Sequence, residues 1–272
     1  MSAPTRIAVA GLGAIGGSVA RAIAGGRVPG AVLVAASARD RARASKSLAA
    51  MGAPDAALVD PGDLAELAEI VVECLPAAAF EAVAEPAVER GRELVVATAS
   101  RLLDRGDLID RAAETGARIR VPTGALVGLD AVRAACVDEA AEVRIISSKP
   151  PRAFAGVAHI AEQGIDLDAV DAPLCLYAGP VREGARLFPA NVNVAAALSL
   201  AAHGPDRTIQ EVWADPGLTR NRHRVVVRSR LADIDAAIEN LPDPDNPRTS
   251  AITAHSIVAL LRRHGAALTV GS

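Results

Sequence analysis

The chain has 272 residues, enough for two domains, and 51% of them are apolar although only 2% are aromatic, so we expect a mainly aliphatic core. The formal charge of −3 is small and the basic residues form no run, which argues against a nucleic-acid-binding surface and favours small-molecule partners. The first residues enter a strand-like segment at once, and later apolar stretches are interrupted before the roughly 20 residues that a membrane span requires. We therefore expect neither a signal peptide nor a transmembrane helix.

Three cysteines are widely separated in the sequence. Cys74, Cys136 and Cys175 form neither a CxxC pair nor the even set that a disulfide framework needs. Free thiols persist in a reducing compartment. The pattern therefore predicts a cytoplasmic protein, and we expect no metal site.

The first half of the chain alternates apolar segments with Ala-rich amphipathic ones. We expect strands at 6–12, 31–37, 69–75, 93–99 and 117–123. We expect helices at 14–26, 39–52, 77–91 and 104–116, most of them ending at a glycine. This alternation predicts a Rossmann-type α/β domain, over 1–123, in which helices cover both faces of a parallel sheet.

After Thr123 the pattern changes. Strand candidates at 141–148, 172–179 and 221–229, with a helix at 191–204, predict a smaller α+β domain over 124–245 that contains a mixed or antiparallel sheet. A helix within 246–272 is expected to return to the first domain. The 3.6-residue period assigns it a packing face made of Ile252, Ser256, Ala259 and Leu260.

A glycine-rich loop lies between the first strand and the first helix. The segment "GLGAIGG" has the G-x-G-x-x-G spacing, in which the glycines permit a tight turn, a close backbone approach to a pyrophosphate, and helix-on-strand packing. The helix N-terminus also favours an anion. We therefore expect NAD or NADP to bind here, at Gly11, Gly13, Ala14, Ile15 and Gly16.

The end of the second strand bears on the choice between NAD and NADP. NAD-selective sites place an acidic residue there to bind the ribose 2′-hydroxyl. This sequence has Ser37 and Arg39 instead, and Asp40 is expected to start the next helix. A guanidinium suits a 2′-phosphate, so we predict that NADP(H) is favoured or that both coenzymes are used. The alternative is that Arg39 is a solvated residue at the start of a helix.

Several later segments carry a resemblance that spans nearly the whole chain. They are "VPTGALVGLDAV", "SSKPPRAFAG", "REGARLFPANVNVAAALSLA", "GPDRT", "ADPGLTRNRH" and "NPRTS". In this order and spacing, together with the glycine loop, they resemble the L-aspartate dehydrogenase family. The resemblance implies NAD(P)-dependent interconversion of L-aspartate with iminoaspartate, or with oxaloacetate and ammonia. It also implies a homodimer and a link to the synthesis of quinolinate, and hence of NAD.

The same resemblance implies roles for particular residues. Ala125 and Asn193 correspond to contacts with the nicotinamide half of the coenzyme, and Asn193 to a substrate contact as well, while His223 corresponds to the catalytic residue. Thr123 replaces the usual serine but keeps a hydroxyl for the substrate. Asn191 is expected to cap the helix on which Asn193 lies in the first turn.

Other candidates come from the chemistry that a dicarboxylate substrate requires. Its carboxylates need cationic partners, and Lys149, held by the "PP" that follows it, is the preferred one. Lys149 as an ordinary surface lysine at a strand end is the alternative. The remaining candidates are three arginines that the sequence does not rank (Arg152, Arg186 and Arg220) and three residues at strand ends that are expected near the coenzyme (Cys74, Leu75 and Thr98).

His223 has two interpretations from sequence alone. Near the start of a strand and between two arginines, it is consistent with a solvated surface histidine. Strand alternation, however, places it on the same face as Val225 and Val227, which favours a buried residue that moves protons. Two competing functions remain open: a dehydrogenase or imine reductase for another small amino or oxo acid, and an NADP(H)-binding sensor without turnover.

Overall fold

The structure is a computed structural model that describes residues 3–137, 141–189, 192–243, 246 and 249–271. Internal contacts divide the chain into two compact units. Unit 1 comprises Met1–Pro122 and Thr253–Val270, and unit 2 consists chiefly of Thr123–Ile252. Within the described residues, no helix is long and apolar enough to cross a bilayer.

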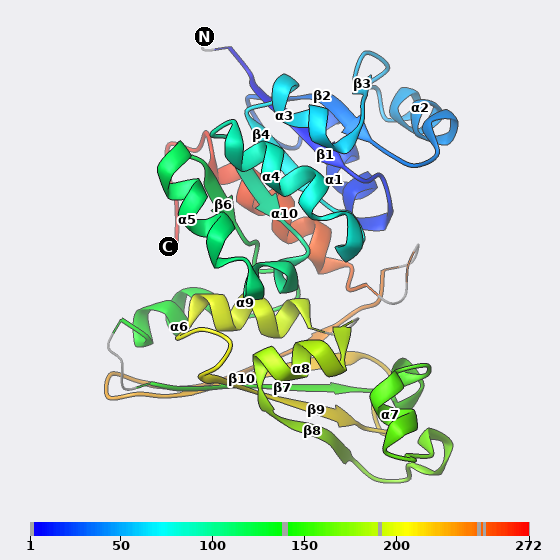
Figure 1. The fold of residues 1–272 in the computed structure, drawn as a ribbon, viewed down its shortest axis with the longest axis vertical. Helices are drawn as coiled ribbons and strands as arrows, with labels where there is room; N and C mark the ends of the chain where they lie inside the picture. Colours follow the sequence, from blue (N-terminus) through cyan, green and yellow to red (C-terminus); the bar gives the residue numbers. More distant parts are fainter. Residues whose placement is uncertain (1–2, 138–140, 190–191, 244–245, 247–248, 272) are drawn as a thin grey trace. The chain divides into compact units, whose positions relative to one another are not determined.

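Unit 1 is built on a sheet of six parallel strands (Figure 1). The strands are β1 (Thr5–Ala10), β2 (Ala31–Ser37), β3 (Ala57–Leu58), β4 (Ile70–Glu73), β5 (Glu93–Val96) and β6 (Arg118–Arg120). The helices are α1 (Ala14–Ala24), α2 (Arg41–Ala50), α3 (Leu64–Leu67), α4 (Glu81–Glu89), α5 (Gly106–Thr115) and α10 (Ile252–Arg263). Short 3₁₀ turns occupy Pro61–Asp63, Ala77–Ala79 and Ala99–Asp104.

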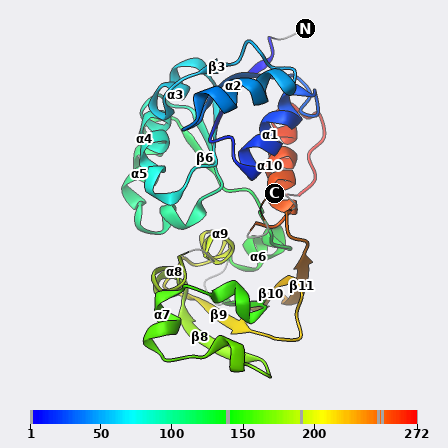
Figure 2. The same cartoon turned by 90° about the vertical axis from the view of Figure 1, so that its right-hand side faces the viewer.

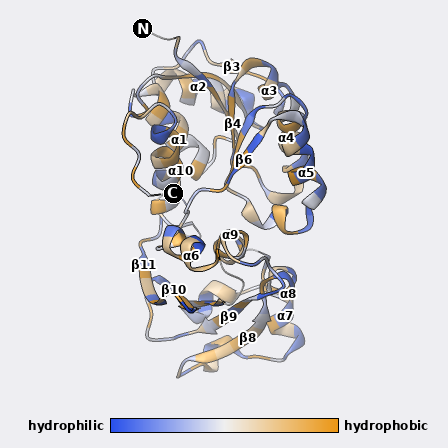
Figure 3. Cartoon of the chain, turned by 90° about the vertical axis from the view of Figure 1, so that its left-hand side faces the viewer, coloured by the Kyte–Doolittle hydropathy of each residue, from blue (hydrophilic) through white to orange (hydrophobic). Residues whose placement is uncertain are grey.

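The strand order β3-β2-β1-β4-β5-β6 reverses direction at β1, so the sheet has a switch point between β1 and β4. Helices α1 and α10 lie on one face of the sheet and α3, α4 and α5 on the other (Figure 2). Because both faces are covered, the central strands are apolar along their length (Figure 3). In β4, for example, every residue is buried, including the final glutamate, Glu73.

The C-terminal helix α10 packs into the core of unit 1 through a face that shares only Leu260 with the predicted one. Ala254, Ile257 and Leu261 are buried in the same cluster as β1 and β2, whereas Ile252 is 43% exposed. Both the predicted face and the buried face of this helix contain apolar residues at helical spacing, and contact with the sheet decides which of the two is buried. The predicted packing face was therefore wrong except at Leu260.

Unit 2 contains a five-stranded mixed sheet in the order β11-β10-β7-β9-β8. Its strands are β7 (Glu142–Lys149), β8 (Leu174–Pro180), β9 (Thr208–Ala214), β10 (Asn221–Arg228) and β11 (Asp233–Asn240). Its helices are α6 (Leu129–Ala135), α7 (Ala158–Glu162), α8 (Val181–Leu187) and α9 (Asn193–Ala201), and 3₁₀ turns occupy Pro151–Phe154 and Leu167–Ala169. Within the described part of this second sheet, β7 and β9 pair in parallel and the other neighbouring strands pair antiparallel.

One face of this second sheet is buried. Alternate residues of β7, β9 and β10 are buried, and α8 and α9 cover the sheet on one side (Figure 1). The predicted fold class, a Rossmann-type parallel sheet followed by an α+β unit, is confirmed. Strands β3, β9 and β11 and helices α3, α6, α7 and α8 are additions that the sequence patterns did not indicate.

Candidate active site

The glycine loop between β1 and α1 fits a dinucleotide, with a separate physical reason at each glycine. Gly11 has a φ of +89°, and a Cβ there would lie 2.7 Å from the Cys74 carbonyl oxygen. A Cβ on Gly16 would lie 1.8 Å from the Gly11 carbonyl oxygen, so α1 packs directly on the loop. Gly13 is exposed, with no atom within 4 Å of its Cβ position. The loop therefore has open space beside the N-terminus of an 11-residue helix, a position whose free N–H groups and dipole suit a pyrophosphate.

The end of β2 has the polar groups that the sequence placed there. Ser37 is 1% exposed, and its hydroxyl has no hydrogen-bond partner among the described residues. Arg39 is exposed and makes no ion pair within the described part of the chain. Asp40 caps α2 by accepting a hydrogen bond from the Arg43 N–H at 2.9 Å, as predicted. Its carboxylate is thus occupied; of the two side chains predicted to bind the ribose, Arg39 is exposed and Ser37 is buried with a hydroxyl unpartnered within the described ranges.

The ends of β4 and β5 meet through a buried carboxylate. Glu73 Oε1 accepts a hydrogen bond from the Leu75 N–H at 2.8 Å, and Oε2 accepts one from the Thr98 N–H at 3.0 Å. The Thr98 hydroxyl lies 3.0 Å from Oε1. Burial raises the pKa of the Glu73 carboxyl, and the N–H donors act in the opposite direction. Cys74 and Leu75 are both half-buried beside this carboxylate.

In unit 2, His223 is buried on the inner face of β10. It is 2% exposed, so the surface-histidine interpretation is wrong. Register pairs it with Ser147 on β7, and the His223 Nδ1 lies 2.9 Å from the Ser147 Oγ. Two β-strands therefore hold the imidazole in one orientation, with one of its nitrogens occupied.

Lys149 lies on the same strand and the same face, two residues after Ser147. It is the last residue of β7 and is only 8% exposed, so it is not a surface lysine. Burial lowers its pKa to about 8. The pKa of His223 is lowered to about 3, mainly by burial and to a smaller extent by the charge of Lys149. Near neutral pH the pair therefore consists of a neutral imidazole and a mainly charged ammonium.

The turn that carries Ala125 is held by an amide from β11. The Leu126 N–H donates to the Thr123 carbonyl at 3.2 Å, which closes the turn, and Thr123 is exposed. The buried Asn240 donates its Nδ2–H to the Ala125 carbonyl at 3.1 Å. Ala125 is thereby fixed to the sheet that carries His223.

The helix that carries Asn193 begins at that residue, which is exposed. Asn191, predicted as its cap, lies outside the described residues, and Val192 occupies the capping position. Arg152, Arg186 and Arg220 are all exposed, and the structure does not rank them as carboxylate ligands. Across the described residues, no group of three His, Cys, Asp or Glu side chains is arranged to hold a metal ion.

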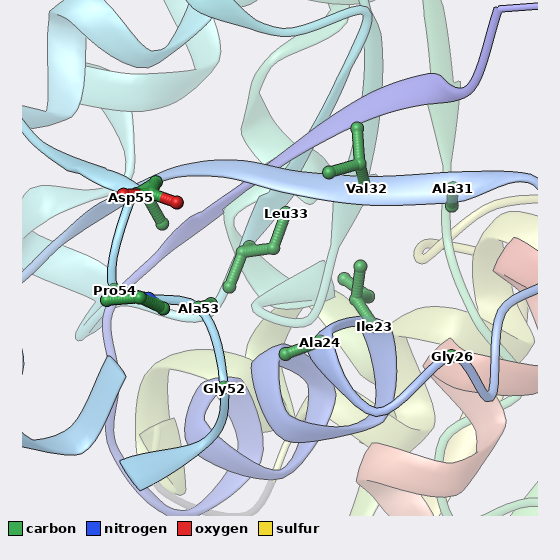
Figure 4. Close-up of a pocket in the computed structure, with 11 residues that line it drawn as sticks. Ile23, Ala24, Gly26, Ala31, Val32, Leu33, Gly52, Ala53, Pro54 and Asp55 are labelled. Atoms are coloured by element: carbon green, nitrogen blue, oxygen red, sulfur yellow. The ribbon is translucent and has the colours of Figure 1, made fainter. Parts of the chain in front are cut away.

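A cavity of about 270 Å³ in unit 1 lies away from these groups (Figure 4). Its lining includes Ala31, Val32 and Leu33, the first residues of β2, and the loop 52–56. The glycine loop follows the carboxyl end of β1, whereas the cavity lies at the amino end of the parallel strand β2. The two are therefore at opposite ends of the strands. Its lining is mainly apolar and includes none of the predicted site residues.

Comparison with known proteins decides the family. A family model described as homoserine dehydrogenase, NAD binding domain, matches residues 11–122, and one described as aspartate dehydrogenase, C-terminal, matches 130–264. An L-aspartate dehydrogenase of Bradyrhizobium diazoefficiens is 46% identical over 272 residues, which cover 100% of this chain and 95% of the relative. The chain belongs to the L-aspartate dehydrogenase family. L-aspartate dehydrogenase 3 of Bordetella bronchiseptica is 45% identical over 266 residues, covering 98% and 97% of the two chains.

The fold of this L-aspartate dehydrogenase family member also matches solved structures. The crystal structure of aspartate dehydrogenase from Thermotoga maritima superposes with a TM-score of 0.74 at 24% identity, over 98% of this chain and 99% of that one. The predicted family, the NAD(P)-dependent dehydrogenase class, and the use of NAD or NADP are confirmed by these matches. Its substrate is a small molecule.

Three polar residues of this family member, Ser147, Glu73 and Asn240, were not identified from the sequence. Ser147 belongs to an ordinary strand, and only the pairing of β7 with β10 places it beside His223. Glu73 had a recognisable signal, because a charged residue at the end of an otherwise apolar buried strand needs compensating partners. Asn240 gave no comparable signal.

Proposed function

We propose that this chain interconverts L-aspartate with iminoaspartate, or with oxaloacetate and ammonia, using NAD or NADP as the hydride acceptor or donor. The observation that carries the choice of substrate is the 46% identity to an L-aspartate dehydrogenase over the full chain. The buried Ser147–His223–Lys149 group supports it, because oxidation of an amino acid requires both proton transfer and carboxylate binding.

The coenzyme is held, in this proposal, by unit 1. The glycine loop binds the pyrophosphate, and Ser37 and Arg39 bind the adenosine ribose, so NADP(H) is favoured or both coenzymes are used. When bound, the nicotinamide ring supplies the hydride acceptor or donor. The remaining tasks, which are orienting the substrate and moving protons, belong to the side chains of the protein.

His223 is the proposed proton carrier. With Nδ1 bonded to Ser147, Nε2 is the nitrogen left for substrate. If the Ser147 hydroxyl donates to Nδ1, Nε2 bears a hydrogen and can donate it; if Nδ1–H donates to Ser147, Nε2 is a base. The serine therefore allows the imidazole to serve reductive amination in one tautomer and oxidation in the other.

Lys149 is the proposed partner of a substrate carboxylate. Its charged form predominates below its pKa of about 8, and a buried ammonium gains strongly from an anion. A bound carboxylate would in turn raise the pKa of His223, because it favours the charged imidazole. Substrate binding thus prepares His223 to accept a proton.

The test of this proposal is an assay with oxaloacetate, ammonia and either NADPH or NADH, followed by the loss of nicotinamide absorbance. A panel of other amino and oxo acids separates aspartate from another small acid. A sensor would bind coenzyme tightly and give no absorbance change with any substrate. The decisive variant is His223→Ala, which should lower kcat by about a hundredfold or more and leave coenzyme affinity nearly unchanged. Full kcat in that variant would remove His223 from the mechanism.

We also propose a homodimer and a cytoplasmic location. The dimer follows from family resemblance, and light scattering of the purified chain tests it. The three free cysteines support a reducing compartment.

A further inference from the structure

The buried carboxylate of Glu73 has no role in the proton chemistry described above. It is 0% exposed and lies at the carboxyl end of β4, immediately beside the switch point of the sheet. In register it faces Ala10, the residue before the glycine loop. A carboxyl group in such a position needs several donors to remain buried.

Both oxygens of this carboxylate accept a backbone N–H. Oε1 is bonded to the Leu75 N–H at 2.8 Å and Oε2 to the Thr98 N–H at 3.0 Å. The Thr98 hydroxyl lies 3.0 Å from Oε1 and 3.2 Å from the Leu75 carbonyl oxygen. A single side chain therefore ties the segment after β4 to the segment after β5.

The first of these segments lies against the glycine loop. A Cβ on Gly11 would lie 3.0 Å from the Leu75 Cδ2, and a Cβ on Gly16 would lie 3.2 Å from the Cys74 Cβ. A shift of Cys74–Leu75 would therefore change the surface beside the loop. The adenosine end of a dinucleotide lies over β2 in such sheets, so the other half extends over β4 and β5.

We propose that Glu73 is a positioning residue for the nicotinamide half of the coenzyme, acting by fixing Leu75 and Thr98 relative to the glycine loop. This inference rests on the coenzyme site of the proposed function and adds to it a residue that does not itself touch the coenzyme. Its strongest consequence concerns Glu73→Gln. Whichever way the amide is turned, its NH₂ faces the N–H of either Leu75 or Thr98, so one backbone donor loses its acceptor.

The experiment compares two ligands by calorimetry: the reduced coenzyme, and the fragment that lacks only the nicotinamide ring. NADPH is paired with 2′-phospho-ADP-ribose and NADH with ADP-ribose, and the pair that the wild type binds more tightly is used. Glu73→Gln should raise the Kd of the reduced coenzyme about tenfold or more and change the Kd of the fragment less than about twofold. Thermal unfolding of each variant establishes that it is folded at the assay temperature.

Two further variants keep the test decisive. Thr98→Val keeps the side-chain shape and the backbone N–H but removes the hydroxyl that contacts Glu73, and it should raise the Kd of the reduced coenzyme about threefold. This variant tests the positioning role if Glu73→Gln does not fold. Glu93→Gln is the matched control, because Glu93 is another buried carboxyl of the same sheet but lies at the start of β5, 3.4 Å from Arg120.

Glu93→Gln should alter stability without changing either Kd. An unchanged Kd for the reduced coenzyme in Glu73→Gln, or a parallel loss of both ligands, would overturn the positioning role. A wild-type chain that binds neither coenzyme would instead overturn the proposed coenzyme site.

Discussion

A buried neutral histidine makes the stability of unit 2 depend on pH. The pKa of His223 gives the size of this pH dependence. Burial and the Lys149 charge lower its folded-state pKa to about 3, whereas an unfolded histidine titrates near 6.5. Between these values the unfolded chain binds a proton that the folded chain does not. Stability therefore rises with pH across this window and is lost as pH falls below about 6.5.

The size of the effect follows from proton linkage. At pH 5 the unfolded histidine is almost fully protonated while folded His223 is still neutral, and at pH 7 both are mainly neutral. From pH 7 to pH 5 this histidine alone lowers the free energy of unfolding by about 2 kcal/mol. His223→Gln cannot take up the proton, so its free energy of unfolding should fall by about 2 kcal/mol less than that of the wild type over the same interval.

Urea unfolding at pH 7 and pH 5, followed by tryptophan fluorescence, measures this difference. The single tryptophan, Trp213, lies on β9 next to β7 and reports on unit 2. His159→Gln, which removes a histidine that contacts Phe188 elsewhere in the unit, is the matched control and should keep the wild-type loss. Equal losses in the wild type and His223→Gln would refute a buried neutral imidazole.

Three further predictions concern catalysis. Ser147→Ala should lower kcat about tenfold by freeing the His223 ring, whereas Ser147→Thr, which keeps the hydroxyl, should retain most activity; steady-state kinetics compares them. In the wild type, the substrate KM should rise above pH 8, where Lys149 loses its charge, and Lys149→Arg should remove this rise because a guanidinium stays charged. The KM is measured from pH 7 to pH 10 in both proteins, and an equal rise in both would contradict the carboxylate-binding role of Lys149. Arg39→Asp should shift the ratio of kcat/KM for NADPH and NADH toward NADH by about tenfold or more, and an unchanged ratio would place Arg39 in solvent.

The sequence was most informative where local pattern and local chemistry coincide. The glycine spacing, the apolar strands and the helix cap at Asp40 depend on residues that are close in sequence, and the structure has them where expected. Strand alternation also predicted that His223 shares a face with Val225 and Val227. Strand β9 was missed because Thr208 and Gln210 occupy its buried face, so its alternation does not follow the usual polar and apolar pattern.

The sequence by itself therefore determined that an α/β unit with a dinucleotide loop precedes an α+β unit, because periodicity and glycine chemistry are properties of short segments. Only the tertiary structure decided which stripe of α10 is buried, that Ser147 lies beside His223, and that Glu73 joins two strand ends. Each of these depends on residues that are between 25 and 76 positions apart, or on a partner surface. Such contacts depend on which strands become neighbours and on how they are aligned, and neither can be read from one segment taken alone.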